Sequence, residues 1–187
     1  MNLNYPDLPF ALVLWVVLSV LGILVLAQTR DRRSELRTEL RLFLCAFAVR
    51  FAMSIVIYQF GLVTVLGDED ASGWVRGAEI QQAWLQQDVS VLELPSVLAG
   101  AFEGQHRGYG FMLGLLFFVT RTAARLPAAV LNCFIGALTV VLVYRIGLAL
   151  FSQRVGVLVG WLACLFPSLI IWSAQTVKEP EIGRAHV

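Results

Sequence analysis

Three consecutive carboxylates, Asp68, Glu69 and Asp70, directly follow a long apolar run, in the stretch LGDEDASGWVRGAEI. An ionised carboxylate within reach of a hydroxyl can act as a general base. Acids in the first turn of a helix also stabilise that helix, by about 0.3–1 kcal/mol each, and Asp68, Asp70 or Ser72 could form an N-cap. Three adjacent acids exceed what capping needs. The residues by themselves leave both interpretations open.

Two arginines interrupt other apolar runs. Arg50 falls about one third of the way along its run, where a lone charge costs several kcal/mol unless it is paired or hydrated. We expect Arg145 to extend toward the membrane surface, as long basic side chains do, and the same position is the simpler interpretation of Arg50. Asn132 and Tyr144 are typical of groups that hydrogen-bond between helices.

No Ser–His–Asp set, glycine-rich phosphate loop or zinc-ligand spacing is present, so no metal ligand and no cofactor is assigned from the residues. The cysteines all lie in apolar runs and resemble small buried hydrophobic residues: Cys45, Cys133 and Cys164.

Composition indicates a membrane protein. The 187 residues are 58% hydrophobic and 14% charged, against about 25% charged for a soluble domain, and the mean hydropathy is +0.76. A net charge of +1 gives no support for a nucleic-acid partner; membrane lipid is the expected surrounding.

The sequence predicts an all-α, polytopic protein, because about 20 apolar residues cross a bilayer as a helix. Four runs meet that length: Leu8–Ala27, Leu42–Leu66, Leu126–Leu150 and Val155–Val177.

Arginines predict the orientation. Residues 29–41 hold five arginines and three acids and are expected to be cytoplasmic, in the cytoplasmic (inner) membrane of a bacterium or archaeon. The N-terminus and residues 67–125 would then lie outside. Within the latter, Gly108–Thr120 is short for a crossing. It is either a helix in the outer interface or a short span, which would invert everything after it.

Residues 70–87 predict a helix of mixed character beside the membrane exit. Trp74, Ala78 and Leu85 recur at near-helical spacing, with Ile80 and Trp84 alongside. The polar side is assigned to four glutamines: Gln81, Gln82, Gln86 and Gln87. Tryptophans suit the interfacial region, so the helix is expected at headgroup depth.

The order of several segments resembles a known family. In GDEDASGWVRGAEI, Asp70, Trp74 and Ala78 fit the first outer loop of polytopic C-type-fold glycosyltransferases. The match is with the protein-mannosyltransferase and aminoarabinose-transferase-like (family 39-like) group. HRGYGFMLGLLFF is similar to its entry into a juxtamembrane helix, and the segment from ARLPAAV to FPSLIIWSAQTVKEP resembles its next two helices. The resemblance covers roughly Leu42–Pro180.

This resemblance implies transfer of a sugar from a polyprenyl-phosphate donor to an acceptor hydroxyl at the extracytoplasmic face. Asp70 would be the general base, and Glu179 would help bind a metal or the acceptor. Lys178 would offset the donor phosphate, with Asp68 and Glu69 as secondary candidates. A divalent metal is used by some such enzymes, but none is assigned. The resemblance also places the turn near Arg154 inside, which favours the interfacial position for residues 108–124.

The last seven residues, EIGRAHV, do not continue the pattern. They can be encoded by GAG ATC GGA AGA GCA CAC GTC, the start of a common sequencing-library adapter. We therefore expect Glu181–Val187 to be adapter translation and the chain to be an inactive N-terminal fragment of a longer enzyme. Two rivals stay open: a transporter or flippase subunit with Arg50 on its pathway, and a small structural membrane protein without catalysis.

Overall fold

A computed structural model describes residues 7–29, 33–62, 73–86, 108–121 and 123–175 of the protein. These residues form helices joined by turns, so the predicted all-α class is confirmed for them. Three helices are long and apolar enough to cross a membrane: α1 (Leu8–Gln28), α2 (Arg33–Gln59) and α6 (Arg125–Leu150). A bent pair, α7 (Gln153–Leu165) and α8 (Pro167–Ser173), adds a fourth if the pair is counted as one crossing.

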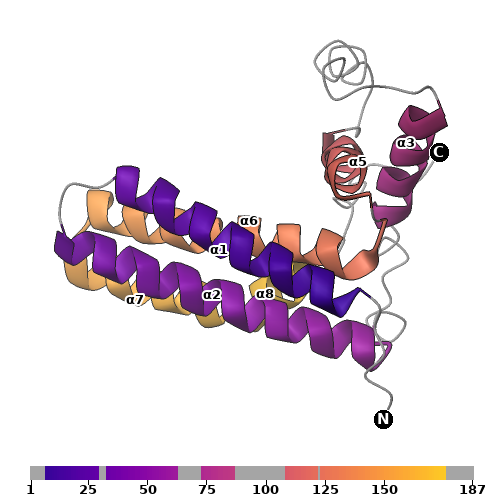
Figure 1. Ribbon diagram of the computed structural model, residues 1–187. Coiled ribbons are helices and arrows are strands. Elements are labelled where there is room, and N and C mark those ends of the chain that lie inside the picture. The colour runs from indigo at the N-terminus through magenta and orange to yellow at the C-terminus, as the bar shows by residue number, and fades with distance from the viewer. Residues whose placement is uncertain (1–6, 30–32, 63–72, 87–107, 122, 176–187) are drawn as a thin grey trace, which may run out of the picture.

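These helices lie side by side as an antiparallel bundle (Figure 1). α6 packs most extensively against α2 and α7, and α1 covers the remaining side of α2 and α6. Most of α1 is exposed apolar surface, including Val13, Val16 and Val17. Apolar side chains facing outward around a helix are those that lipid, rather than water, would solvate.

Aromatic rings fill the space between α1, α2 and α6. The Trp15 ring of α1 lies 5.6 Å from that of Phe47 and 5.8 Å from that of Phe51. Phe134 of α6 meets Phe43 and Phe47 edge-on, each at 5.9 Å between ring centroids. Offset and edge-to-face pairs of this kind add about 0.5–1.5 kcal/mol beyond their buried area, so they fix how α1 sits against the bundle.

Glycines bring α6 and α7 into backbone contact. A Cβ atom on Gly156 would lie 2.9 Å from the backbone nitrogen of Leu148 and 3.1 Å from the carbonyl oxygen of Tyr144. A Cβ on Gly147 would lie 3.0 Å from the Cα of Gly156. Small residues permit this approach between membrane helices. Ser152 separates the helices and accepts a hydrogen bond from the backbone N–H of Val155 at the start of α7.

The prediction of one continuous helix over Val155–Val177 is wrong, because the helix is broken. α7 ends at Leu165, and α8 starts at Pro167 with its axis turned by 56°. Pro167 has no N–H to donate to the carbonyl of Ala163, and its ring also disfavours helical geometry at Phe166. Phe166 is extended, with φ −67° and ψ 117°. The proline thus sets the position of the break.

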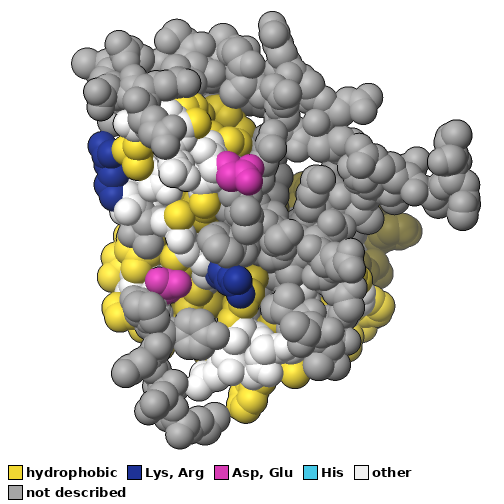
Figure 2. Space-filling view, turned by 90° about the vertical axis from the view of Figure 1, so that its right-hand side faces the viewer, with side chains coloured by type: hydrophobic (Ala, Val, Ile, Leu, Met, Phe, Trp, Pro, Cys, Tyr) yellow, Lys and Arg dark blue, Asp and Glu magenta, His cyan; other side chains and the backbone are white. Residues whose placement is uncertain are grey.

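Two shorter helices, α3 (Gly73–Gln86) and α5 (Gly108–Thr120), pack on each other at one end of the bundle (Figure 1). α5 runs crosswise to the long helices there. Leu113 and Phe117 of α5 join Ala128 of α6 in one buried cluster, with Ala78 of α3 against it. Figure 2 views the molecule from this side, where a few charged side chains of the described residues are visible beside hydrophobic ones.

Candidate functional site

The residues assigned to catalysis by the sequence lie outside the described part of the chain. These are the candidate base and its neighbours, and the pair after the fourth apolar run: Asp68, Glu69, Asp70, Lys178 and Glu179. The structure describes what flanks them. α3 begins at Gly73, three residues after Asp70, and Gln175 is the last described residue before Lys178.

Arg50 lies in the centre of the bundle and is 1% exposed. Its Nη1 atom donates to the carbonyl oxygens of Ala46 and Cys164, each at 3.3 Å, and Nη2 donates to that of Ala163 at 3.3 Å. The interpretation that Arg50 extends to the cytoplasmic surface is therefore wrong. The guanidinium instead points into the bundle, against the end of α7.

The break in α7 explains this position. The last carbonyls of any helix lack an intrahelical donor, and the proline removes the one that Ala163 would otherwise have. Arg50 supplies donors to Ala163 and Cys164. Its positive charge is also favourable near the negative end of the helix dipole. Arg50 is thus a side-chain cap for the broken helix, supplied from another helix.

A similar contact caps the end of α8. Asn132 of α6 donates from Nδ2 to the carbonyl oxygen of Gln175 at 2.6 Å. The Cys133 thiol lies 3.5 Å from the carbonyl oxygen of Ser173. The prediction that Asn132 hydrogen-bonds between helices is confirmed. Tyr144, which the sequence assigns to the same role, is fully buried at the α6–α7 contact.

Buried polar atoms gather on the same side of α2 and α8. Ser54 lies one turn beyond Arg50 on α2 and is fully buried. Gln175 is buried after α8. The Nε atom of Arg50, the Oγ atom of Ser54 and the Oε1 atom of Gln175 have no hydrogen-bond partner among the described residues. Such atoms are costly in an apolar interior, so this is one polar region within the bundle core.

A second polar cluster lies at the opposite end of the bundle. Arg145 of α6 forms a two-point ion pair with Glu39 of α2: Nε lies 2.9 Å from Oε1 and Nη2 lies 2.7 Å from Oε2. Nη2 also donates to the Thr29 hydroxyl of α1 at 2.9 Å. The Glu39 side chain is 0% exposed and that of Arg145 is 29% exposed. Arg145 was expected only to extend to the surface; it also joins three helices.

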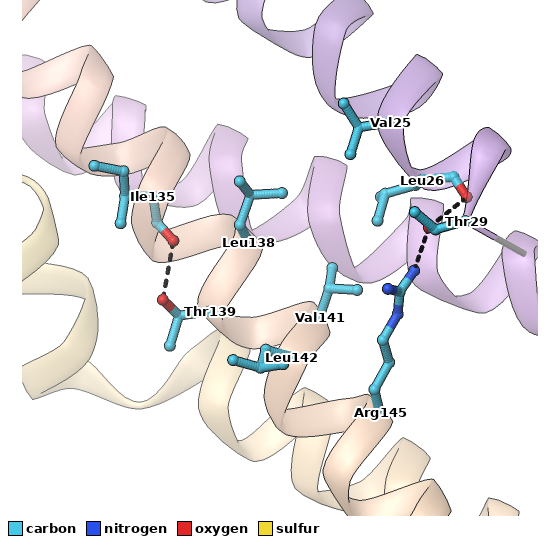
Figure 3. A pocket seen from close by; sticks show the side chains of 9 residues that line it. All are labelled: Val25, Leu26, Thr29, Ile135, Leu138, Thr139, Val141, Leu142 and Arg145. Atoms are coloured by element: carbon cyan, nitrogen blue, oxygen red, sulfur yellow. Dashed lines mark hydrogen bonds between the residues drawn. The ribbon is translucent and has the colours of Figure 1, made fainter.

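A groove of about 320 Å³ lies between α1 and α6 beside this ion pair (Figure 3). α1 contributes Val25, Leu26 and Thr29 to its wall. α6 contributes the longer wall: Ile135, Leu138, Thr139, Val141, Leu142 and Arg145. The Thr139 hydroxyl donates to the carbonyl of Ile135 on its own helix, at 3.0 Å. The groove is therefore apolar along its length and polar at the end where Arg145 and Thr29 meet.

The buried face of α3 differs from the predicted one. Gln81 was assigned to the polar side, but it is buried and donates from Nε2 to the carbonyl oxygen of Phe117 at 2.9 Å. Trp84 is buried against Phe111 and Phe118 of α5, whereas Leu85 is exposed. Ala78, Gln81 and Trp84 are spaced three residues apart and so share a face. The terminal carbonyls of α5 provide a partner that sequence periodicity does not show.

Two features here carried a sequence signal that was not used. Pro167 inside an apolar run indicates a kink or break, and a broken helix needs donors for its carbonyls. Glu39, grouped with a cytoplasmic link, follows Glu35 by four residues, which is the spacing of one helical face. Both glutamates are buried. No signal in a single sequence pairs Glu39 with Arg145, 106 positions later.

Among the described residues, no group of three or more histidine, cysteine, aspartate or glutamate side chains could hold a metal ion. Comparison with known proteins found no matching family model, no similar curated protein and no similar solved structure. The described residues are those of a helical protein, and three of their helices are long and apolar enough to cross a membrane.

Proposed function

We propose that this chain is the N-terminal part of a membrane glycosyltransferase that takes its sugar from a polyprenyl-phosphate donor. It would cross the cytoplasmic membrane four times, with α7 and α8 as one bent crossing. α3 and α5 would lie at the extracytoplasmic interface. Asp70 would accept the proton of an acceptor hydroxyl, with Glu179 and Lys178 binding the acceptor and the donor phosphate. Support for the family comes from the order and spacing of the quoted motifs.

One structural relationship carries the proposal. The helix that follows Asp70 by three residues, α3, packs through Ala78 against the cluster that Leu113 and Phe117 of α5 form with Ala128 in the first turn of α6. Gln175, four residues before Glu179, bonds to Asn132 of the same helix. Asn132 lies about one turn beyond Ala128. The described residues nearest to the candidate carboxylates, α3 and Gln175, thus both contact the first turns of α6 or the cluster there, which supports a shared site.

The arrangement of α5 supports the interfacial position. At 13 residues it is about 20 Å long, short of the hydrocarbon thickness of about 30 Å. It also runs crosswise to the long helices (Figure 1). With α5 outside the membrane core, the two ends of the bundle keep the orientation that the arginines of residues 30–41 indicate.

The test is an assay of sugar transfer by membranes that contain the protein encoded by the complete natural reading frame. Asp70→Asn should abolish transfer from a polyprenyl-phosphate sugar and leave donor binding unchanged. Asp88→Asn is the matched control. It removes a carboxylate from the same acidic stretch, and no role in transfer is assigned to that carboxylate. Unchanged transfer with Asp70→Asn would remove the base assignment. Absence of any transfer by the unaltered protein would remove the glycosyltransferase proposal.

A transporter is the second candidate, and one observation favours it. Discontinuous helices with polar groups at the break are a feature of transporter binding sites, and α7–α8 is broken beside Arg50. Against this role, Arg50 is 1% exposed and donates to three carbonyls. Solute uptake into vesicles, lost with Arg50→Lys and retained with Asp70→Asn, would favour the transporter.

A further inference from the structure

We propose that the groove between α1 and α6 binds one anionic phospholipid, with an acyl chain along the groove and the phosphate at Arg145. This inference goes beyond the proposed glycosyltransferase activity. It concerns the end of the bundle opposite α3 and α5, and it stands on different residues.

The length of the groove fits one leaflet. Its wall on α6 runs from Ile135 to Arg145, which is about 15 Å along a helix at 1.5 Å per residue. The hydrocarbon core of a bilayer is about 30 Å thick, so one leaflet contributes about 15 Å. A chain that fills the groove would therefore end near the middle of the membrane and leave its headgroup beside Arg145.

The apolar wall is suited to a hydrocarbon chain. Ile135 and Leu142 are exposed on α6, and Val25 is exposed on α1 across from them. The Thr139 hydroxyl donates its proton to the carbonyl oxygen of Ile135 on the same helix, so it needs no acceptor in the groove. Figure 3 shows these side chains along the two facing helices, with Arg145 reaching Thr29 at one end.

Arg145 retains donors for a phosphate. Glu39 and Thr29 engage Nε and Nη2. The Nη1 atom forms no hydrogen bond to a described residue, and the side chain is 29% exposed. Because the ion pair holds the guanidinium in place, its remaining N–H groups are fixed at the mouth of the groove. A guanidinium is well suited to phosphate oxygens.

The surrounding charge favours an anionic headgroup over a zwitterionic one. Glu39 formally neutralises Arg145, but three other arginines of this end are exposed: Arg37, Arg41 and Arg154. Each basic residue near an anionic surface contributes about 1 kcal/mol of attraction. That corresponds to about fivefold in affinity. The predicted occupant is thus a phospholipid such as phosphatidylglycerol, rather than phosphatidylcholine.

Native mass spectrometry of the purified full chain in detergent tests the headgroup. Phosphatidylglycerol should bind about fivefold more tightly than phosphatidylcholine with the same acyl chains. The double variant Glu39→Gln/Arg145→Gln removes the guanidinium that would bind the phosphate, and it should bind phosphatidylglycerol about fivefold more weakly. Its net charge equals that of the unaltered chain, so attraction to the basic end as a whole is unchanged. Equal binding of the two lipids by the unaltered chain, or an unchanged affinity of the double variant for phosphatidylglycerol, overturns the proposal.

A second pair of variants tests the acyl chain and does not alter the ion pair. Leu142→Trp places an indole in the groove and should weaken phosphatidylglycerol binding about fivefold or more. Leu158→Trp is the matched control, because Leu158 is similarly exposed but lies on α7 outside the groove; it should bind as the unaltered chain does. Equal effects of the two substitutions contradict a chain in this groove. Displacement of the lipid by millimolar inorganic phosphate would show a phosphate site instead and also overturn the proposal.

Discussion

Arg50 donates a hydrogen bond from Nη1 to the carbonyl oxygen of Cys164, 3.3 Å away and 114 positions later in the chain. This bond joins α2 to the end of α7, directly before the Pro167 break. The same relationship occurs twice more: Asn132 donates to Gln175 after α8, and Gln81 donates to Phe117 in the last turn of α5. Side chains from neighbouring helices thus satisfy carbonyls at the ends of α5 and α7 and just beyond the end of α8.

Replacing Arg50 by methionine should destabilise the bundle by about 1–3 kcal/mol, because the carbonyls of Ala163 and Cys164 would lose their donors in an apolar surrounding. Arg50→Lys should recover part of the loss, since an ammonium has three donors. Thermal or SDS-induced unfolding in micelles measures both. Greater stability of Arg50→Met than of the unaltered chain would show that burying the charge costs more than its bonds contribute.

The proline break offers a direct check on that explanation. In a Pro167→Ala background, residue 167 regains an N–H for the carbonyl of Ala163. Arg50→Met should then cost at least about 1 kcal/mol less than it does beside the proline. The measurement is a double-mutant cycle in the same unfolding assay. Strict additivity of the two changes would mean that Arg50 does not act as the cap of α7.

Glu39→Gln or Arg145→Gln alone should each cost more than the two together. Removing one partner of a buried pair typically costs about 3–5 kcal/mol, because it leaves the other charge without its counterion. The loss of stability should be smaller for Glu39→Gln, because the Arg145 side chain left without its partner is 29% exposed and can reach water. Unfolding of both single variants and the double variant gives the coupling. Equal losses in all three would show that the pair contributes through packing only.

Asn132→Ala should destabilise the protein by about 0.6–1.7 kcal/mol, the range measured for hydrogen bonds between membrane helices. Its bond to the carbonyl of Gln175 is short, at 2.6 Å, and joins α6 to the end of α8. Thr139→Ala on the same helix is the control, because that hydroxyl bonds within α6 on an exposed face. The prediction fails if Thr139→Ala costs as much.

Gly156→Ala should separate α6 from α7 and cost about 1–3 kcal/mol, the usual penalty for overpacking. The added Cβ would meet backbone atoms of Tyr144 and Leu148, which cannot rotate away. Gly160→Ala, one turn later, would chiefly meet the end of the Leu42 side chain at 2.8 Å. That side chain can move, so the cost there should be smaller. Unfolding midpoints of the two variants decide the order.

Local sequence determined the long helices. The runs Leu8–Ala27 and Leu126–Leu150 agree with α1 and α6 within one or two residues at each end, because an uninterrupted apolar run of that length favours one helix. The second run was predicted as a helix over Leu42–Leu66, but α2 begins earlier, at Arg33, and ends earlier, at Gln59. Its charged first turns continue the same helix, and composition alone marks only the apolar part.

Tertiary structure decided the partners of the polar residues. The sequence places Arg50, Gln81 and Arg145 on helices. Their polar character alone favours positions that face water or the membrane surface. In the structure, all three donate to groups on other helices. The carbonyls at helix ends and the carboxylate of Glu39 become available only when the helices pack. Their positions depend on contacts between residues that are distant in the chain, and such contacts leave no periodic pattern in the sequence.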